Sequence, residues 1–227
     1  MKRKEPTVKT KRLILRPMSD AETEELIESC GSDELREAYS EMLAGCRRKP
    51  DQRIWYTPWR MTLKNGGQTV GDLCFKGPVK DNAVEIGYGV LSACEGQGYA
   101  TEAVQAMKDW AFSQEGVVFL EAETAPDNAA SQRVLEKCGF TRDGEGLEGP
   151  RFVCEAPMTN WMTIYMLLGM SVGTGIGTSL GNVGIGMSIG IGAGLCLGLG
   201  IDASAKKERE AIREARRMRS ESPKDLE

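Results

Sequence analysis

Several residue types and patterns are missing from this chain of 227 residues. It contains no histidine, and its seven cysteines are scattered without a Cys-x-x-Cys pair. These absences argue against a zinc site and against a nucleophile activated by histidine, and they favour a reducing compartment. Lysine and arginine number 29 against 33 acidic residues, so the chain also lacks the basic excess typical of nucleic-acid binding. We therefore expect neither a metal ion nor a nucleic-acid partner.

Charge is missing from one long segment, residues 156–201. This uncharged run is about twice the roughly 20 residues that a helix needs to span a bilayer. The charged start, Met1–Pro6, is not followed by an apolar run, so we expect no secretory signal. Length and composition together predict a globular domain at residues 1–155, a glycine-rich hydrophobic segment at 156–201 and a charged helix or tail at 202–227.

The stretch Glu95–Ala103 lies between a predicted strand and a predicted helix. Apolar residues alternate along Ala83–Leu91, which predicts a strand, and they recur at helical spacing from Val104 onward. Gly96 and Gly98 therefore fall on a strand-to-helix turn, where glycine lets the backbone approach a ligand and the first amides of the helix are free. Such a turn favours binding of a phosphate, although a tight turn that merely requires glycine has the same pattern.

A second block of elements, Val117–Phe140, follows shortly afterwards. It predicts a strand, a Pro-Asp-Asn turn and a helix that ends at Gly139. An Asn-Gly pair predicts a hairpin between two earlier strands. The remaining predicted elements are strands at 12–17, 55–63, 69–75 and 151–154 and helices at 19–30 and 33–48.

Two segments allow two interpretations each. The aromatic residues Trp55, Tyr56 and Trp59 suit either a binding surface or packing on a strand, and we favour packing. Residues 143–150 are rich in glycine and acidic side chains. They suit either a hairpin loop near a binding site or a turn in solvent, and we favour the turn.

The two blocks together resemble the GNAT superfamily of acetyl-CoA-dependent N-acetyltransferases. The resemblance covers residues 11–155, and the opening Arg-Leu-Ile-Leu-Arg-Pro is similar to that of the ribosomal-protein N-acetyltransferase branch. Gly98 and Ala100 match the family's pyrophosphate loop, whereas Glu95 stands where the family usually has glutamine or arginine. The second block matches the family at Asn128, Ala130, Ser131, residues 133–137, Gly139 and Phe140.

This resemblance implies an α/β GNAT fold, with a mixed, mostly antiparallel central sheet flanked by helices. It implies an enzyme that moves an acetyl group from acetyl-CoA, the co-substrate, to a primary amine on a protein N-terminus or a small molecule. It also implies that backbone amides at the end of the strand before the loop face the thioester oxygen. The coenzyme contacts that it implies are Val90, Leu91, Gln97, Gly98, Tyr99, Ala100, Thr101, Asn128 and Ser131.

Acetyl transfer requires a base, because the amine must lose a proton before it attacks. With no histidine in the chain, the base is a carboxylate or a water held by one. Glu85 is our first candidate, since GNAT enzymes often have a glutamate on the strand before the loop; the alternatives are Glu123 and a Glu85 that merely faces solvent. Many GNAT enzymes have a tyrosine that acts as the general acid, seven residues after the asparagine that corresponds to Asn128. Here that position is Leu135, which leaves Ser131 or a water as the acid.

Glycine recurs at every fourth position inside the uncharged segment, at 169, 173, 177 and 181 and again at 186, 190, 194 and 198. Each series lies on one helical face, where small residues let helices approach closely in lipid, and the segment resembles bacterial glycine-zipper sequences. We predict two membrane helices, about Trp161–Leu180 and Val183–Ile201, and a basic amphipathic helix, Lys206–Arg219, on the cytoplasmic surface. Alternate glycines also suit a strand or an aggregating or oligomerising element.

Three hypotheses about function follow from these patterns. The first is an N-acetyltransferase whose catalytic domain faces the cytoplasm and whose hairpin, residues 161–201, tethers it to the membrane. The second is a module that binds acetyl-CoA without turnover, which the residues Glu95 and Leu135 favour. The third is a glycine-zipper protein, acting in a membrane or in oligomerisation, in which the GNAT domain is a passenger.

Overall fold

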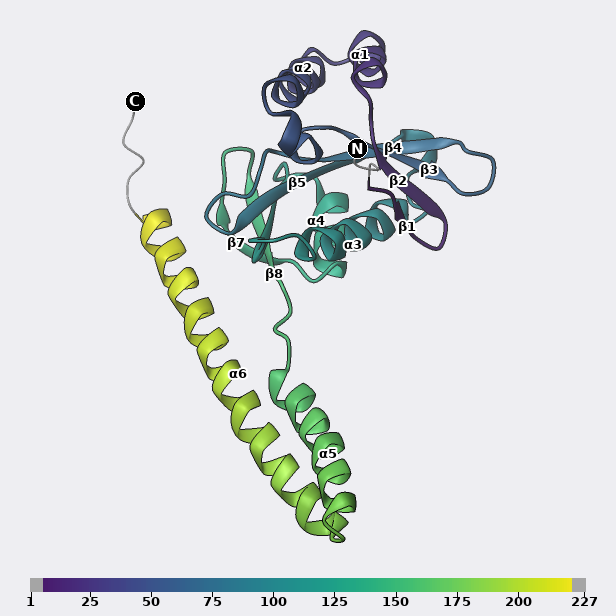
Figure 1. Cartoon of the computed structure of the whole chain (residues 1–227). Helices are drawn as coiled ribbons and strands as arrows, with labels where there is room; N and C mark the ends of the chain where they lie inside the picture. The colour runs from purple at the N-terminus through teal and green to yellow at the C-terminus, as the bar shows by residue number, and fades with distance from the viewer. Residues whose placement is uncertain (1–5, 222–227) are drawn as a thin grey trace. The chain divides into compact units, whose positions relative to one another are not determined.

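The computed structural model describes residues 6–221. Internal contacts divide the chain into two compact units, residues 1–156 and residues 157–227. The first unit is a sheet with helices on both faces, and the second is a hairpin of two helices (Figure 1). The predicted α/β class with a glycine-rich helical hairpin is therefore confirmed.

The sheet is mixed and mostly antiparallel, as predicted. In the described part of the chain it has eight strands, in the order β1-β2-β3-β4-β5-β6-β8-β7. All neighbouring strands are antiparallel except β5 and β6, which are parallel. The strands are β1 (Val8–Lys9), β2 (Leu13–Pro17), β3 (Trp59–Leu63), β4 (Thr69–Phe75), β5 (Ala83–Val90), β6 (Phe119–Glu123), β7 (Thr141–Glu145) and β8 (Pro150–Glu155).

Helices α1 and α2 lie on one face of the sheet, and α3 and α4 lie on the other (Figure 1). The strand predicted at 55–63 begins only at Trp59, because Pro50 starts a short 3-10 helix and Pro58 has no N–H to give to the sheet. The helices are α1 (Asp20–Ser29), α2 (Asp33–Arg48), η1 (Pro50–Trp55), η2 (Ser92–Cys94), α3 (Tyr99–Phe112), α4 (Ala129–Lys137), α5 (Trp161–Ser179) and α6 (Val183–Glu221).

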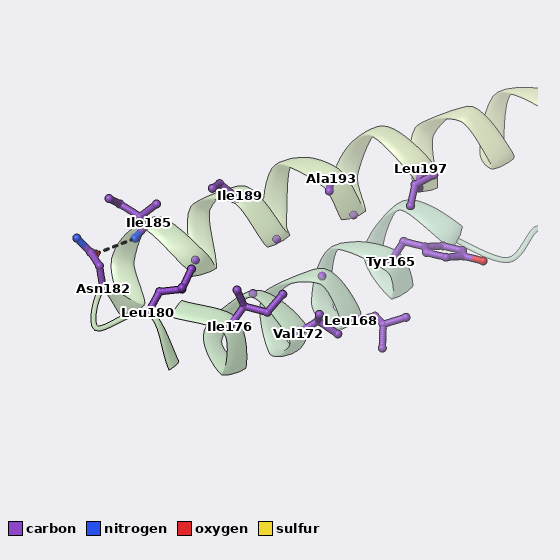
Figure 2. Close-up of a pocket in the computed structure, with 15 residues that line it drawn as sticks. Tyr165, Leu168, Val172, Ile176, Leu180, Asn182, Ile185, Ile189, Ala193 and Leu197 are labelled. Carbon is purple, nitrogen blue, oxygen red and sulfur yellow. Dashed lines mark hydrogen bonds between the residues drawn. The ribbon is translucent and has the colours of Figure 1, made fainter. Parts of the chain in front are cut away.

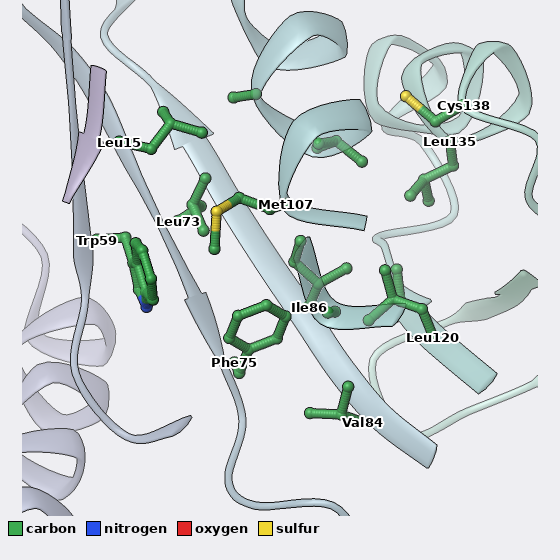
Figure 3. Packing of buried hydrophobic residues seen from close by; sticks show 14 of the residues in the cluster. Leu15, Trp59, Leu73, Phe75, Val84, Ile86, Met107, Leu120, Leu135 and Cys138 are labelled. Atoms are coloured by element: carbon green, nitrogen blue, oxygen red, sulfur yellow. The ribbon is translucent and has the colours of Figure 1, made fainter. Parts of the chain in front are cut away.

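The hydrophobic core lies between the sheet and the pair α3 and α4 (Figure 3). Val84 and Ile86 of β5 are buried there against Met107 of α3, as the alternation along the strand predicts. The ring of Trp59 is fully buried and packs with that of Trp110, at 4.9 Å between centroids. Trp55 and Trp59 therefore pack in the core, as favoured, although Trp55 lies on η1 and not on a strand. Tyr56 is half-buried and its ring lies against Gly45 of α2.

Strands β5 and β6 are paired over only part of their length. Their partners run from Ala83 opposite Phe119 to Glu85 opposite Glu121. β5 continues beside β4 as far as Val90, but its ladder with β6 ends at Glu85. The open edge therefore lies at the carboxyl ends of two parallel strands, which is where α/β proteins bind ligands.

The helical hairpin is held together by direct contact between backbones. The turn after α5 contains Gly181, with a φ of 75°. A Cβ on Gly190 would lie 2.1 Å from the carbonyl oxygen of Gly169, and a Cβ on Gly173 would lie 2.3 Å from that of Gly186. These positions therefore admit only glycine at the observed separation, and the fourfold spacing is what brings the helices so close.

Asp202 closes the open end of the hairpin. Its two carboxylate oxygens accept the N–H groups of Trp161 and Met162, at 2.9 and 3.0 Å. These amides belong to the first turn of α5, where they have no acceptor within the helix. A carboxylate is also favoured there by the helix dipole. The middle of α6 is thus bonded to the start of α5.

Helix α6 is longer than predicted. It continues past Ile201 to Glu221, so the charged segment predicted as a separate helix or tail is the last part of the same helix. The reason is local, because residues 202–221 contain no glycine or proline and are rich in alanine, lysine, arginine and glutamate. Most of these residues are strong helix formers.

The hairpin exposes aliphatic side chains and carries an apolar groove of about 570 Å³ along one face (Figure 2). Leu168 and Ile176 of α5 and Ile189 of α6 line this groove, and each is more than half exposed. Within the described residues, one helix, over Val183–Arg216, is long and apolar enough by length and composition to cross a membrane. α5 is not among the helices that reach that level. Two spanning helices remain a prediction.

Replacing Gly190 and Gly192 by alanine, one at a time, tests the backbone contact. Gly190→Ala should destabilise the hairpin by about 1–3 kcal/mol, because its Cβ meets a carbonyl oxygen. Gly192→Ala should be neutral or stabilising by up to about 1 kcal/mol, because nothing lies within 4 Å of its Cβ and alanine favours helix. Thermal unfolding of the full chain in detergent, followed by circular dichroism, measures both. Equal effects would contradict the packing described here.

Candidate active site

The predicted phosphate loop is a strand-to-helix turn between β5 and α3. Gly96 and Gly98 have φ values of 70° and 78°, in the left-handed region that glycine favours. No side chain caps α3, and its first helical hydrogen bond runs from the N–H of Glu102 to the carbonyl oxygen of Gly98. The N–H groups of residues 99–101 are therefore available to an external acceptor. A diphosphate fits this set of donors.

Arg12 contacts this loop, although sequence analysis did not select it. Its guanidinium donates to the carbonyl oxygen of Gln97 at 2.9 Å and pairs with Glu102 at 2.6 Å. The same group lies 4.5 Å from the centre of the Tyr99 ring. No spacing pattern connects a residue before β2 with a loop after β5, so only the folded chain shows this neighbourhood.

Val90 and Leu91, whose amides are predicted to face the thioester oxygen, differ in availability. The N–H of Leu91 donates to the carbonyl oxygen of Val70 at 2.9 Å, within the sheet. Leu91 is therefore not a free donor, which corrects that part of the prediction. Hydrogen bonds alternate along an antiparallel ladder, so the N–H of Val90 points to the opposite edge, beyond the end of the β5–β6 ladder.

Asn128 and Ser131 come together at the start of α4. The Oδ1 atom of Asn128 accepts the N–H of Ser131 at 2.9 Å and thereby caps the helix. Asn128 thus fixes the position of Ser131. Leu135, at the position where many relatives have tyrosine, is fully buried in the core and has no polar atom to offer.

A tyrosine reaches Ser131 from β5 instead of α4. The Oη atom of Tyr88 lies 2.9 Å from Ser131 Oγ and 3.1 Å from the Ser131 carbonyl oxygen. Burial raises the pKa of Tyr88 to about 12, and the hydrogen bond with Ser131 opposes this only in part, so the phenol keeps its proton at neutral pH. The alternation along Ala83–Leu91 puts Tyr88 on the same face as the buried Val84 and Ile86. No pattern in the sequence reveals its contact with Ser131, because α4 is distant in sequence.

Glu85 lies on the face of β5 opposite to Tyr88, because side chains alternate along a strand. The ammonium of Lys76 lies 2.7 Å from Glu85 Oε1 and 2.6 Å from Glu148 Oε1. The contact with Glu85 is an ion pair without hydrogen-bond alignment, since this buried oxygen has no hydrogen-bond partner among the described residues. Burial raises the pKa of Glu85, Lys76 lowers it in part, and Glu123 and Glu148 raise it again. The net shift is upward.

Glu123, the second candidate base, supports the tip between β7 and β8. Its Oε2 atom accepts the N–H groups of Leu147 and Glu148, at 2.9 and 3.0 Å. A Cβ on Gly146 would lie 1.9 Å from the other carboxylate oxygen, so a larger residue there would displace the Glu123 carboxylate. The turn predicted at 143–150 does lie in solvent, since β7 and Leu147 are exposed, but β7 extends to Glu145 and the tip is also bonded to Glu123 of the sheet.

The candidate residues fall into two groups, one on each face of β5. Ser131 and Tyr88 lie on the side of α3 and α4, and Glu85 lies with Lys76 on the other side. The structure does not bring Glu85 and Ser131 into contact. The ladder between β5 and β6 ends at Glu85, so the two groups lie on either side of the unpaired edge of β5.

Comparison with known sequences points to one family. A model of the acetyltransferase (GNAT) domain matches residues 12–141. The uncharacterized N-acetyltransferase YjdG of Bacillus subtilis is 33% identical over 94 residues, which cover 41% of this chain and 56% of YjdG. The uncharacterized N-acetyltransferase YoaA of the same species is 25% identical over 150 residues, 61% of this chain and 85% of YoaA.

Solved structures share the fold at low sequence identity. An acetyltransferase from Agrobacterium tumefaciens has a TM-score of 0.54 at 22% identity, over 69% of this chain and 98% of its own. The ribosomal-protein-S5-alanine acetyltransferase from Vibrio fischeri has a TM-score of 0.54 at 16% identity, over 69% and 99% of the two chains. RimL, a ribosomal L7/L12 alpha-N-protein acetyltransferase in complex with coenzyme A, has a TM-score of 0.53 at 18% identity, over 66% and 98%.

The family model covers more than half of the chain and includes the glycine loop, Asn128 and Ser131. The mixed sheet, with its one parallel pair and the uncapped helix after the loop, agrees with that match. This chain therefore belongs to the GNAT acetyltransferase family.

Proposed function

We propose that this protein is an N-acetyltransferase that moves an acetyl group from acetyl-CoA to a primary amine. The observation that carries the proposal is the uncapped start of α3 behind Gly98, next to the open edge of β5. The free amides at the start of α3 suit a diphosphate, and the unpaired edge of β5 suits a thioester. We propose a protein N-terminus as the first acceptor class, with small-molecule amines as the second. Names of structural relatives that mention ribosomal proteins support that order.

Binding of the co-substrate would rest on backbone donors. The amides of residues 99–101 would hold the diphosphate, and the N–H of Val90 would bond the thioester oxygen as it gains negative charge. Asn128 would act indirectly, because its Oδ1 holds Ser131. Acetyl-CoA supplies an acetyl group activated as a thioester.

Glu85 would take the proton from the incoming ammonium, so that the neutral amine nitrogen can form its bond to the carbonyl carbon. The raised pKa of Glu85 brings its basicity closer to neutral pH, which improves a general base. Lys76 is held by two carboxylates, which raise its pKa against the opposing effect of burial, so it remains an ammonium. Its charge keeps Glu85 ionised and ready to accept a proton.

Ser131 would donate a hydrogen bond to the sulfur as the carbon–sulfur bond breaks. A thiol pKa of about 8.5 makes the thiolate a good leaving group, so a hydrogen bond suffices while the carbon–sulfur bond breaks. The second proton that the nitrogen loses as the amide forms can then pass through water to the thiolate. Tyr88 keeps its proton, for which the Ser131 carbonyl oxygen and Ser131 Oγ are the two acceptors within reach. When Tyr88 donates to Oγ, the serine proton is free to point at the sulfur. Glu85 would thus act on the amine from one face of β5, and Ser131 would act on the leaving sulfur from the other face.

We also propose that the hairpin tethers the enzyme to a membrane, with the catalytic domain in the cytoplasm. The supporting observations are the uncharged run, the exposed aliphatic side chains of both helices and the length of α6. α5 has 19 residues and is therefore about 28 Å long, close to the roughly 30 Å hydrocarbon thickness of a bilayer. The basic residues after Asp202 suit an anionic membrane surface.

Turnover by the full chain in detergent tests the enzymatic proposal. We expect acetyl-CoA to bind, measured by calorimetry, and free thiol to appear only when a primary amine is added. Ser131→Ala should lower kcat about 100-fold, whereas Tyr88→Phe should lower it only about three- to tenfold, because one hydrogen bond is lost and the serine remains. Binding without turnover for every amine would favour the non-catalytic module, and no binding would refute the proposal.

The pH dependence of kcat/KM tests the role of Glu85. The base must be ionised, so activity should fall on the acid side, at a pH above the ordinary glutamate range because the pKa is raised. Lys76→Met removes the charge that lowers this pKa, and the acid limb should move further up in pH. Glu85→Gln should lower kcat/KM by about 10²- to 10⁴-fold. An acid limb that stays in place in Lys76→Met would exclude Glu85 as the titrating group.

Charged substitutions on the exposed faces of the hairpin test the membrane tether. Val172 of α5 and Ile189 of α6 are 56% and 67% exposed, so lysine is tolerated at both positions if the hairpin lies in water. In lipid, each lysine near the middle of a helix costs about 2.5–3.5 kcal/mol or more. The double variant Val172→Lys/Ile189→Lys should therefore leave the membrane fraction that holds the unaltered protein. An unchanged distribution would count against insertion.

A further inference from the structure

The phosphate loop has an electrostatic deficit. Residues 91–101 contain no lysine or arginine, and they include Glu95 at the position where related loops have glutamine or arginine. Glu102 adds a second carboxylate in the first turn of α3. Backbone amides alone would therefore face a doubly charged diphosphate beside two acidic side chains. A cation from elsewhere in the chain would correct this deficit.

Arg12 is the cation that the fold brings to this place. Its side chain is 42% exposed, so it is open to a ligand. Contacts with Gln97, Glu102 and the ring of Tyr99 fix the plane of its guanidinium. The Nη2 atom lies 3.6 Å from the point where a side chain on Gly98 would begin, so it borders the glycine at the centre of the loop.

The guanidinium is not needed to attach Glu102 to the β1–β2 region. Glu102 Oε1 accepts the hydroxyl of Thr10 at 2.5 Å and the backbone N–H of Arg12 at 2.7 Å. These two bonds would persist with any residue at position 12. The side chain of Arg12 engages Glu102 through Nε and Gln97 through Nη1, which leaves Nη2 without a hydrogen-bond partner among the described residues.

We propose that Arg12 binds the diphosphate of acetyl-CoA and supplies the positive charge that position 95 lacks. This inference rests on the proposed function and names one more residue of the same site. Its guanidinium presents N–H groups beside the amides of residues 99–101, and a planar fork of this kind suits phosphate oxygens. Glu102 then orients the arginine and does not compete for its free edge.

The test compares coenzyme binding by three variants of the full chain with that of the unaltered protein, by calorimetry in the same detergent. Arg12→Gln should weaken acetyl-CoA binding about tenfold or more, because a hydrogen bond to a charged group is lost. Arg12→Gln/Glu95→Arg should recover most of the affinity, since it returns a cation to the position where related loops have one. Glu102→Gln weakens one of the contacts that orient Arg12 but keeps the cation, which Gln97 and Tyr99 still hold, and it removes a negative charge beside the diphosphate. It should therefore lose clearly less affinity than Arg12→Gln.

A purely structural role for Arg12 gives a different result. Arg12→Gln and Glu102→Gln would then weaken binding alike, with lower thermal stability in both, and Glu95→Arg would rescue nothing; that pattern would overturn the inference. Equal affinity of Arg12→Gln and the unaltered protein would also overturn it, while leaving the proposed function intact. If the unaltered protein itself does not bind acetyl-CoA, the proposed function fails, and this inference fails with it.

Discussion

The short parallel pairing of β5 with β6 is the constraint on which the catalytic domain depends. Three residue pairs hold the strands together at their amino-terminal ends, and the ladder then stops while β5 runs on beside β4. If the pairing continued to Val90, the backbone donors on that edge would be consumed by the sheet. Because it stops at Glu85, the sheet stays continuous and still offers an opening at the place where the glycine loop begins.

The opening also bears on how the proposed chemistry would proceed without histidine. In that proposal the base and the hydrogen-bond donor to the leaving group do not share one pocket, so no single residue would have to serve both. Each has its own neighbour on its own face, an ammonium beside Glu85 and a buried phenol beside Ser131. The two neighbours differ in charge. Lys76 is a cation that favours the ionised carboxylate of Glu85, whereas Tyr88 keeps its proton and is neutral. A strand with alternating side chains separates these environments without any additional structure.

Local patterns in the sequence predicted most elements of the fold and one part of the site. Alternation identified β5, and the paired glycines located the turn before α3. What these patterns could not reveal are contacts between distant segments. The neighbour of Glu85 depends on the register between β4 and β5, and the contact between Arg12 and Gln97 depends on how β2 passes the loop. Such pairings depend on how the whole sheet packs, and they leave no repeating pattern in the sequence from which they could be predicted.

Boundaries were predicted less well for a similar reason. The charged stretch after Ile201 differs from the glycine segment in composition, which suggested a separate element, yet helix formation depends on propensity and not on polarity. The loop at 143–150 looked like a solvated turn because its residues are polar. Most of these residues are indeed exposed, but the backbone amides of Leu147 and Glu148 also find an acceptor in Glu123, a strand residue that is distant in sequence.

The glycine repeat has a consequence for the alignment of the hairpin. Both helices carry glycine at every fourth position, so backbone contact alone does not distinguish the observed alignment from one displaced by a turn; after such a slip, glycine would again oppose glycine. A displacement of four residues is about 6 Å along the axis, which would carry Asp202 out of reach of the amides of Trp161 and Met162. The glycine repeat therefore allows the two helices to pack closely. Asp202 at the open end of the hairpin, together with the short turn at the closed end, selects one register.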